Sequence, residues 1–175
     1  SKKITKTIED KKDQIVNKLN TNKVKNIKDE IKTDIENISS TIIKEYLAAF
    51  KNPKALQEFI LKWKISALDR LTSMSSKEDV ILETSKKIID LSNFWSVRDP
   101  ENDLILYILP GKVLWSRIGE ILSDNSRFGY MNFNGVYELK EAKESLISEI
   151  AIGQKDESGK IIVIEKGTAN ILRVI

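Results

Sequence analysis

Apolar side chains recur every eleven residues in the segment from residue 24 to residue 46. They are separated by three, four and four positions, an average of about 3.67 residues per turn, which keeps the stripe nearly straight along one helix face. Such a stripe predicts a long amphipathic helix that packs on another helix, from this chain or from a neighbouring one. The helix-packing interface predicted in this way consists of Val24, Ile27, Ile31, Ile35, Ile38, Ile42 and Tyr46.

The helix predicted around this repeat covers approximately residues 22–50. An earlier set of isoleucines keeps a similar spacing but is shifted by one position, and the phase changes in the polar segment 20–22. Asn and Thr are poor in helix interiors and common at caps, so a weak break is expected there. Asn52-Pro53 is expected to end this helix and to start the next one. Residues 1–50 are therefore predicted to form an extended amphipathic helical arm.

The distribution of glycine favours helices over the whole first part of the chain. All seven glycines lie between Gly111 and Gly167, so the first 110 residues contain none. Glycine is the commonest residue in positive-φ turns, and its absence favours long helices with few tight turns. Residues 53–97 also carry helix-spaced apolar positions, and Ser75 and Glu78 have the spacing of a capping box. We predict a two-helix segment at 53–97 and almost continuous helical structure over residues 1–97.

Residues 104–175 are rich in turn residues and predict a mixed α/β module. The elements expected in it are a strand at 104–109, a helix at 113–122, a hairpin around Asn134-Gly135, a helix at 138–150, and a terminal hairpin of 160–165 with 169–175. The expected fold class is thus α+β: a long helical N-terminal part followed by a small mixed α/β module that ends in a β-hairpin.

The composition excludes several kinds of catalytic site. The chain has 175 residues without a cysteine or a histidine. This excludes disulfides, thiolate metal sites and hydrolases that rely on a histidine base. Asp99, Glu101 and Asp103 could hold a hard cation through oxygen ligands, but an ordinary solvated loop is the favoured interpretation. We therefore expect no catalytic residue, no metal and no cofactor, and a carboxylate- and cation-dependent enzyme is the third hypothesis.

The sequence indicates no localisation. Its longest apolar run, at residues 104–109, is far shorter than the roughly 18 residues of a membrane span. The first residues lack the apolar core of a secretory signal peptide. Binding to a membrane surface is disfavoured as well, because the apolar stripe contains no Trp or Phe before Phe50.

Positive charge is concentrated at the start of the chain. The formal net charge is +3, and residues 1–25 contain eight lysines and three acids, which is a local net charge of +5. Lysines neutralise phosphates without reading bases, so a solvated helix face is favoured and phosphate binding is the alternative. The candidate phosphate-binding residues are Lys2, Lys3, Lys6, Lys11 and Lys12. DNA reading by the helix expected at 138–150 is rejected, because that segment has a net charge of −2.

These observations favour a non-enzymatic structural protein. We expect it to self-associate, or to dock in a larger complex such as a filament, a shell or a multiprotein assembly, through its long helix. The partners would be further copies of this chain or other protein subunits. The alternative is a nucleic-acid-associated protein that binds phosphate non-specifically through its lysine-rich N-terminus.

Overall fold

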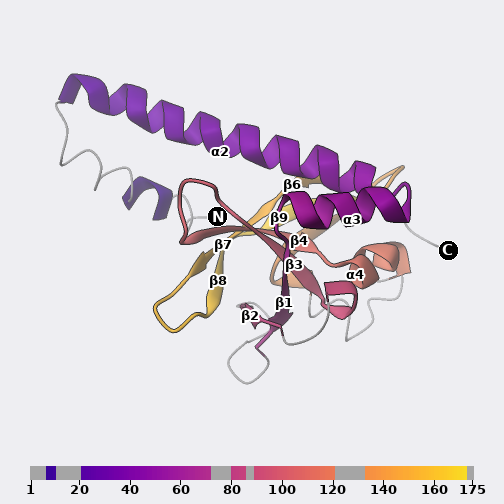
Figure 1. The fold of residues 1–175 in the computed structure, drawn as a ribbon. Helices are drawn as coiled ribbons and strands as arrows, with labels where there is room; N and C mark the ends of the chain where they lie inside the picture. Colours follow the sequence, from indigo (N-terminus) through magenta and orange to yellow (C-terminus); the bar gives the residue numbers. More distant parts are fainter. Residues whose placement is uncertain (1–6, 11–20, 72–79, 86–88, 121–132, 173–175) are drawn as a thin grey trace.

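Figure 1 shows the fold in a computed structural model that describes residues 7–10, 21–71, 80–85, 89–120 and 133–172, without the side chains of 21–31. The elements in chain order are a helical turn at residues 7–10, α2 (Thr21–Ala49), α3 (Pro53–Lys62), β1 (Ser66–Arg70), β2 (Ile81–Thr84), η1 (Ile89–Leu91), β3 (Phe94–Arg98), β4 (Ile105–Pro110), α4 (Lys112–Ser116), β5 (Tyr137–Glu141), β6 (Leu146–Glu149), β7 (Ala151–Lys155), β8 (Ile161–Glu165) and β9 (Gly167–Ile171). Among these residues, no helix has the length and apolar character needed to span a membrane.

In this part of the chain, six antiparallel strands close into a barrel in the order β1–β2–β8–β7–β4–β3. The barrel closes where β1 pairs with β3 and Ser66 lies opposite Ser96. Side chains alternate between the interior and the outer face along each strand. Leu68 and Ile108 fill the interior, whereas Trp95 lies on the outer face and contacts aromatic rings of the α2 region. Closure pairs the strand edges that an open sheet would expose.

One long β-ribbon connects the barrel to a second sheet. β6 leads into β7 across Ile150, and β8 leads into β9 across Lys166, so both strands of the ribbon pass from one sheet to the other. The second sheet has the order β5–β9–β6, with β5 parallel to β9. Gly167 lies at the bend, where an added Cβ would be 2.2 Å from Tyr137 Cε1 and 2.5 Å from the carbonyl oxygen of Glu149. The close approach of the two sheets therefore requires glycine at this position.

Helices α2 and α3 cover one side of the barrel. Asn52 caps α3, because its side-chain oxygen accepts a hydrogen bond from the Ala55 N–H at 2.8 Å and Pro53 occupies the first turn. The C-terminal end of α2 is tied to the barrel by Tyr46, which is fully buried and donates a hydrogen bond to the Pro110 carbonyl oxygen at 2.9 Å. The N-terminal part of α2 extends past the barrel (Figure 1).

The predicted fold class is wrong. The structure is mostly β, a closed barrel with a small second sheet, and not a long helical part followed by a mixed module. For the same reason, it is wrong to describe the chain as a helical protein organised by an amphipathic eleven-residue repeat. The two helices expected at 53–97 are replaced by α3, η1 and strands β1 to β3.

The conformation of Lys64 explains much of this error. Its φ of 49° is left-handed, the conformation that glycine usually supplies after the last turn of a helix. Helix α3 therefore ends at Lys62, and β1 begins at Ser66. The absence of glycine from the first 110 residues did not exclude a sharp turn, because a lysine makes it.

The hairpin expected at Asn134-Gly135 is also wrong. A two-residue hairpin turn of this composition needs positive φ at both positions, and neither residue is among the described ones with positive φ. Gly135 instead packs against Val80, whose Cγ2 would lie 1.9 Å from an added Cβ. The strand that follows, β5, pairs with β9 and not with a preceding strand.

Two further predictions for the C-terminal part fail, although its isolated strands are found. β4 and β8 confirm the strands expected at 104–109 and 160–165. The terminal hairpin is wrong, because β8 pairs with β2 and β7 whereas β9 pairs with β5 and β6. The helix expected at 138–150 is wrong as well, because β5 and β6 occupy that segment.

Candidate functional site

A groove of about 510 Å³ lies between α2 and the strands below it. It forms where α2 crosses over the region in which β6 passes into β7, so that one flank of the helix faces the β-ribbon. We call it the α2 groove. Its apolar surface consists of Ile8, Ile35, Ile43, Ile150 and Ile152. A groove lined in this way favours an apolar ligand or side chain that would otherwise be exposed to water.

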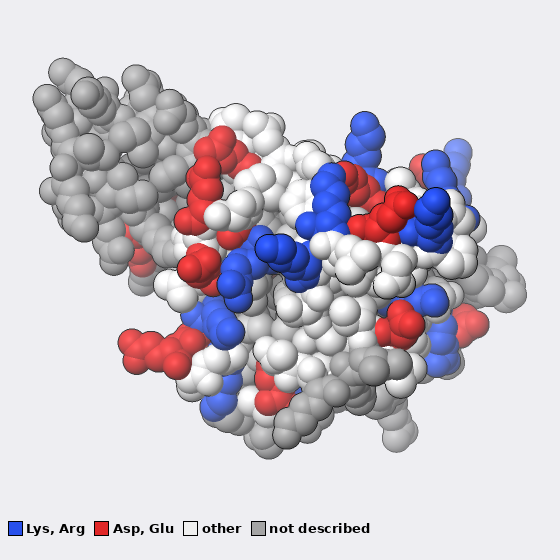
Figure 2. All heavy atoms as spheres, viewed as in Figure 1, with Lys and Arg blue, Asp and Glu red and all other residues white. Residues whose placement is uncertain are grey.

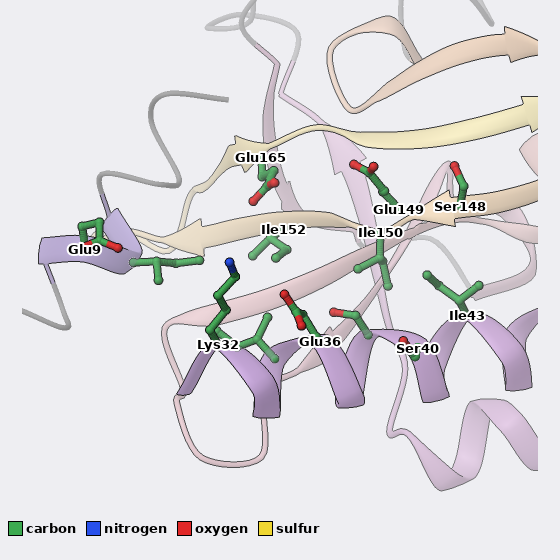
Figure 3. Close-up of a pocket in the computed structure, with 13 residues that line it drawn as sticks. Glu9, Lys32, Glu36, Ser40, Ile43, Ser148, Glu149, Ile150, Ile152 and Glu165 are labelled. Atoms are coloured by element: carbon green, nitrogen blue, oxygen red, sulfur yellow. The ribbon is translucent and has the colours of Figure 1, made fainter. Parts of the chain in front are cut away.

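Carboxylates surround this apolar surface. Glu36 comes from α2, Glu149 from β6, Glu165 from β8 and Glu9 from the helical turn at residues 7–10, and Lys32 is the one cation among the described lining residues. The formal net charge of these described lining residues is therefore −3. Figure 3 shows Glu165 pointing from its strand toward α2, with Lys32 and Glu36 projecting from α2 toward the strands. Both walls of the groove thus contribute acidic groups.

The electrostatics of Glu165 indicate what this site would stabilise. Partial burial raises the pKa of its carboxyl group, and the nearby charge of Glu149 raises it further. A carboxylate that is partly desolvated beside another carboxylate is stabilised by a cation that approaches both. The α2 groove is therefore suited to a positively charged group attached to an apolar one.

In the acidic segment between β3 and β4, the buried acid Asp99 stabilises the turn itself. Asp99 is buried, and its carboxylate accepts hydrogen bonds from the N–H of Glu101 at 2.9 Å, from the N–H of Asn102 at 3.1 Å and from the Tyr107 hydroxyl at 2.7 Å. Its oxygens therefore stabilise the chain reversal. Over the described ranges, no group of three or more Asp or Glu side chains is placed to hold a metal ion.

The residues of the predicted helix-packing interface are divided between packing and the groove. Ile42 and Tyr46 are fully buried and Ile38 is partly buried, all against the core that the barrel and α3 share. Ile35 is also partly buried and lines the α2 groove. These side chains therefore pack against a core to which both the ten-residue helix α3 and the barrel contribute. Three predicted residues have side chains outside the described set: Val24, Ile27 and Ile31.

All five candidate phosphate-binding lysines also lie outside the described residues, so phosphate binding by them stays a prediction. The acidic groove was missed because Glu36, Glu149 and Glu165 are far apart in the sequence. They meet only where the helix crosses the β-ribbon. No local pattern in the sequence signals that crossing.

No protein-family model, curated protein or solved structure matches this chain.

Proposed function

We propose that this protein is a non-enzymatic assembly protein that binds a basic, amphipathic segment of a partner protein in the α2 groove. The observation that supports the proposal is the combination of an isoleucine surface with carboxylates on both walls. A segment that alternates apolar and basic side chains would match both features at once.

The two features contribute differently to binding. Full burial of one aliphatic side chain of the partner contributes about 1.5–3 kcal/mol, so the isoleucines supply most of the affinity. Carboxylates at a partly exposed rim contribute less to affinity and more to the choice of partner and to the association rate. The net charge of −3 would attract basic segments and repel acidic ones.

A second copy of this chain is a partner of suitable charge. Residues 1–25 have a net charge of +5 and contain several isoleucines. Because Ile8 and Glu9 of this segment line the groove of their own molecule, exchange of the segment between two molecules would produce the self-association expected from the sequence. A measurement of molar mass in solution by light scattering, at low and high salt, distinguishes self-association from binding of a different protein.

The proposal is tested with a synthetic amphipathic peptide of Lys and Leu, titrated against the whole protein by fluorescence anisotropy. We expect saturable binding, and no binding of a Glu and Leu peptide with the same pattern. Replacing Glu36 and Glu149 by Gln should weaken binding roughly tenfold, because two favourable ion pairs are lost. Ile35→Ser should weaken it as well, without any change in charge.

The matched control removes the same charge elsewhere. Glu58 and Glu138 are exposed and do not line the groove, so replacing both by Gln should leave peptide affinity unchanged. Equal binding of the basic and acidic peptides, or equal losses in the two double variants, would show that the groove is not the docking site.

The other hypotheses have less support. Non-specific nucleic-acid binding through Lys2, Lys3, Lys6, Lys11 and Lys12 stays an alternative that the same anisotropy assay can examine with an oligonucleotide. No arrangement of described carboxylates favours the cation-dependent enzyme over the docking function.

A further inference from the structure

A second cavity, of about 600 Å³, opens at one end of the barrel, far along the strands from the bend at Ile150. The interior side chains Leu68, Leu106 and Ile161 line its base. Around them lie residues from the end of α3 and from strands β1, β2, β3, β4, β7 and β8. We call this cavity the barrel mouth.

Strand register places two cations at this mouth, where Arg98 is exposed and Lys155 is half-buried. Arg98 lies opposite Leu106, and Lys155 lies opposite Ile161. Directly opposed residues of neighbouring strands project to the same face of the sheet, so Arg98 and Lys155 share the interior face with the apolar base. Gly153 is two residues before Lys155 on β7 and belongs to the same interior face. An added Cβ there would be 2.8 Å from both Ile108 Cδ1 and Ile161 Cγ2. The interior is therefore tightly packed there.

Lys64 lines the mouth as well. In the part of the chain that the structure describes, no ion pair joins Arg98, Lys155 or Lys64 to a carboxylate. Asp99, a buried acid that also lines the mouth, already accepts three hydrogen bonds in the β3–β4 turn. One acid, Asp103, is exposed at the rim. Figure 2 shows Lys and Arg side chains gathered across the middle of the face below α3.

The mouth also offers neutral donors and an oriented aromatic ring. Ser66 and Ser96 lie opposite each other at its edge, and the Ser96 hydroxyl donates to the Ser66 carbonyl oxygen at 3.4 Å. Trp63 lines the mouth, and its orientation is fixed because Nε1 donates to Glu45 Oε2 at 2.6 Å. The ammonium group of Lys62 lies 5.3 Å from the centre of that ring.

We propose that the barrel mouth binds a small organic phosphate, the phosphate ester of a planar group such as a nucleoside. A guanidinium group with two ammonium groups suits a phosphate, and the cavity has the size of a small-molecule site. The Trp63 ring and the apolar base would contact the planar group. This inference concerns a different site from the docking groove and does not depend on it.

The test is isothermal titration calorimetry of the whole protein at low salt with AMP, inorganic phosphate and adenosine. We expect AMP to bind about tenfold more tightly than inorganic phosphate, because one stacked base adds that much affinity, and adenosine to bind most weakly. Replacing Arg98 and Lys155 by Gln should weaken AMP binding by at least about tenfold, because charge-assisted hydrogen bonds are lost. Trp63→Leu should reduce AMP affinity to that of phosphate and leave phosphate affinity unchanged.

The matched control replaces Lys140 and Lys143, which are exposed and lie outside the mouth, by Gln. It should bind AMP as the unchanged protein does. Absence of AMP binding at about 1 mM ligand, or equal losses in the two double variants, overturns the proposal. A different result would indicate an extended nucleic-acid surface instead. In that case a single strand of about ten nucleotides would bind the unchanged protein far more tightly than AMP does, and both double variants would lose the same amount of affinity for the strand.

Discussion

Buried tyrosine hydroxyls connect the elements of this protein at the scale of single residues. Tyr46 joins α2 to β4 through the Pro110 carbonyl oxygen, and Tyr107 fixes the β3–β4 turn through Asp99. Tyr137 joins the second sheet to the barrel through the Ile108 carbonyl oxygen and the Ala151 N–H. Burial raises the pKa of all three, and for Tyr107 the hydrogen bond to Asp99 raises it further. They therefore remain neutral donors at physiological pH.

Tyr137→Phe should lower the free energy of unfolding by about 1–3 kcal/mol. The Tyr137 hydroxyl donates to the Ile108 carbonyl oxygen at 2.5 Å and accepts from the Ala151 N–H at 3.2 Å, so the variant loses two buried hydrogen bonds. Tyr46→Phe loses one and should cost less. Denaturation in urea measures both effects, and equal stability of Tyr137→Phe and the unchanged protein would contradict this role.

Glu165 should make a contribution to stability that decreases as the pH rises. Its pKa is raised in the folded protein by burial and by Glu149, so the folded state holds the proton more tightly than the unfolded chain does. The contribution is complete below the ordinary value of 4.5 and is lost as the pH rises through the higher folded pKa. Glu165→Gln should remove this dependence, and Glu138→Gln should keep it. Urea denaturation over that pH interval measures the free energy of unfolding of each protein. Parallel dependences on pH for Glu165→Gln and the unchanged protein would refute the assignment.

At the scale of elements, the chain turns where local conformation and close packing permit it. Lys64 ends α3 by adopting a left-handed conformation. The β7–β8 turn is closed by Asp156, whose carboxylate accepts from the Ser158 hydroxyl at 2.6 Å and from the N–H groups of Ser158 and Lys160 at 2.9 Å. The hydrogen bond from Ser158 holds the pKa of Asp156 below its ordinary value. Gly159 follows in that turn with a φ of 85°.

Gly167→Ala should destabilise the fold more than Gly159→Ala. An added Cβ at Gly167 meets Tyr137 and the backbone of Glu149 and Ala151, all within 2.6 Å, and such overpacking costs about 1–3 kcal/mol or more. At Gly159 the nearest atom is 3.9 Å away, so only the left-handed conformation opposes alanine, at about 1–2 kcal/mol. Thermal melting of the two variants compares them, and a smaller loss at Gly167 would show that the bend can relax.

At the scale of the whole molecule, the two cavities have opposite charge and different construction. The α2 groove forms because helix α2 crosses the β-ribbon. The barrel mouth forms because strand register brings together residues from both halves of the chain. One barrel therefore supports an acidic site against its covering helix and a basic site at one open end. This separation allows each proposed site to be altered without changing the other.

Local signals in the sequence were sufficient where neighbours along the chain decide the conformation. Asn52-Pro53 caps a helix through its own backbone geometry. The apolar runs at 104–109 and 161–164 form strands, of which β4 is buried along its whole length and β8 leaves Ile162 exposed. The segment 137–141 could have been read correctly too, because Tyr137 and Leu139 alternate with exposed Glu138 and Lys140. Helical spacing of a few leucines and isoleucines was given too much weight there.

The barrel, its register and both cavities depend on contacts between distant segments. Strand pairing is decided by which apolar faces can be buried together, so nothing near residues 66–70 or 94–98 specified that β1 and β3 would close a barrel. Arg98, Lys155, Glu149 and Glu165 look like ordinary surface charges in the sequence. They acquire a candidate role only because strand pairing places Arg98 and Lys155 at a barrel end, and because α2 crosses beside the strands of Glu149 and Glu165. Such positions exist only once the whole chain has packed.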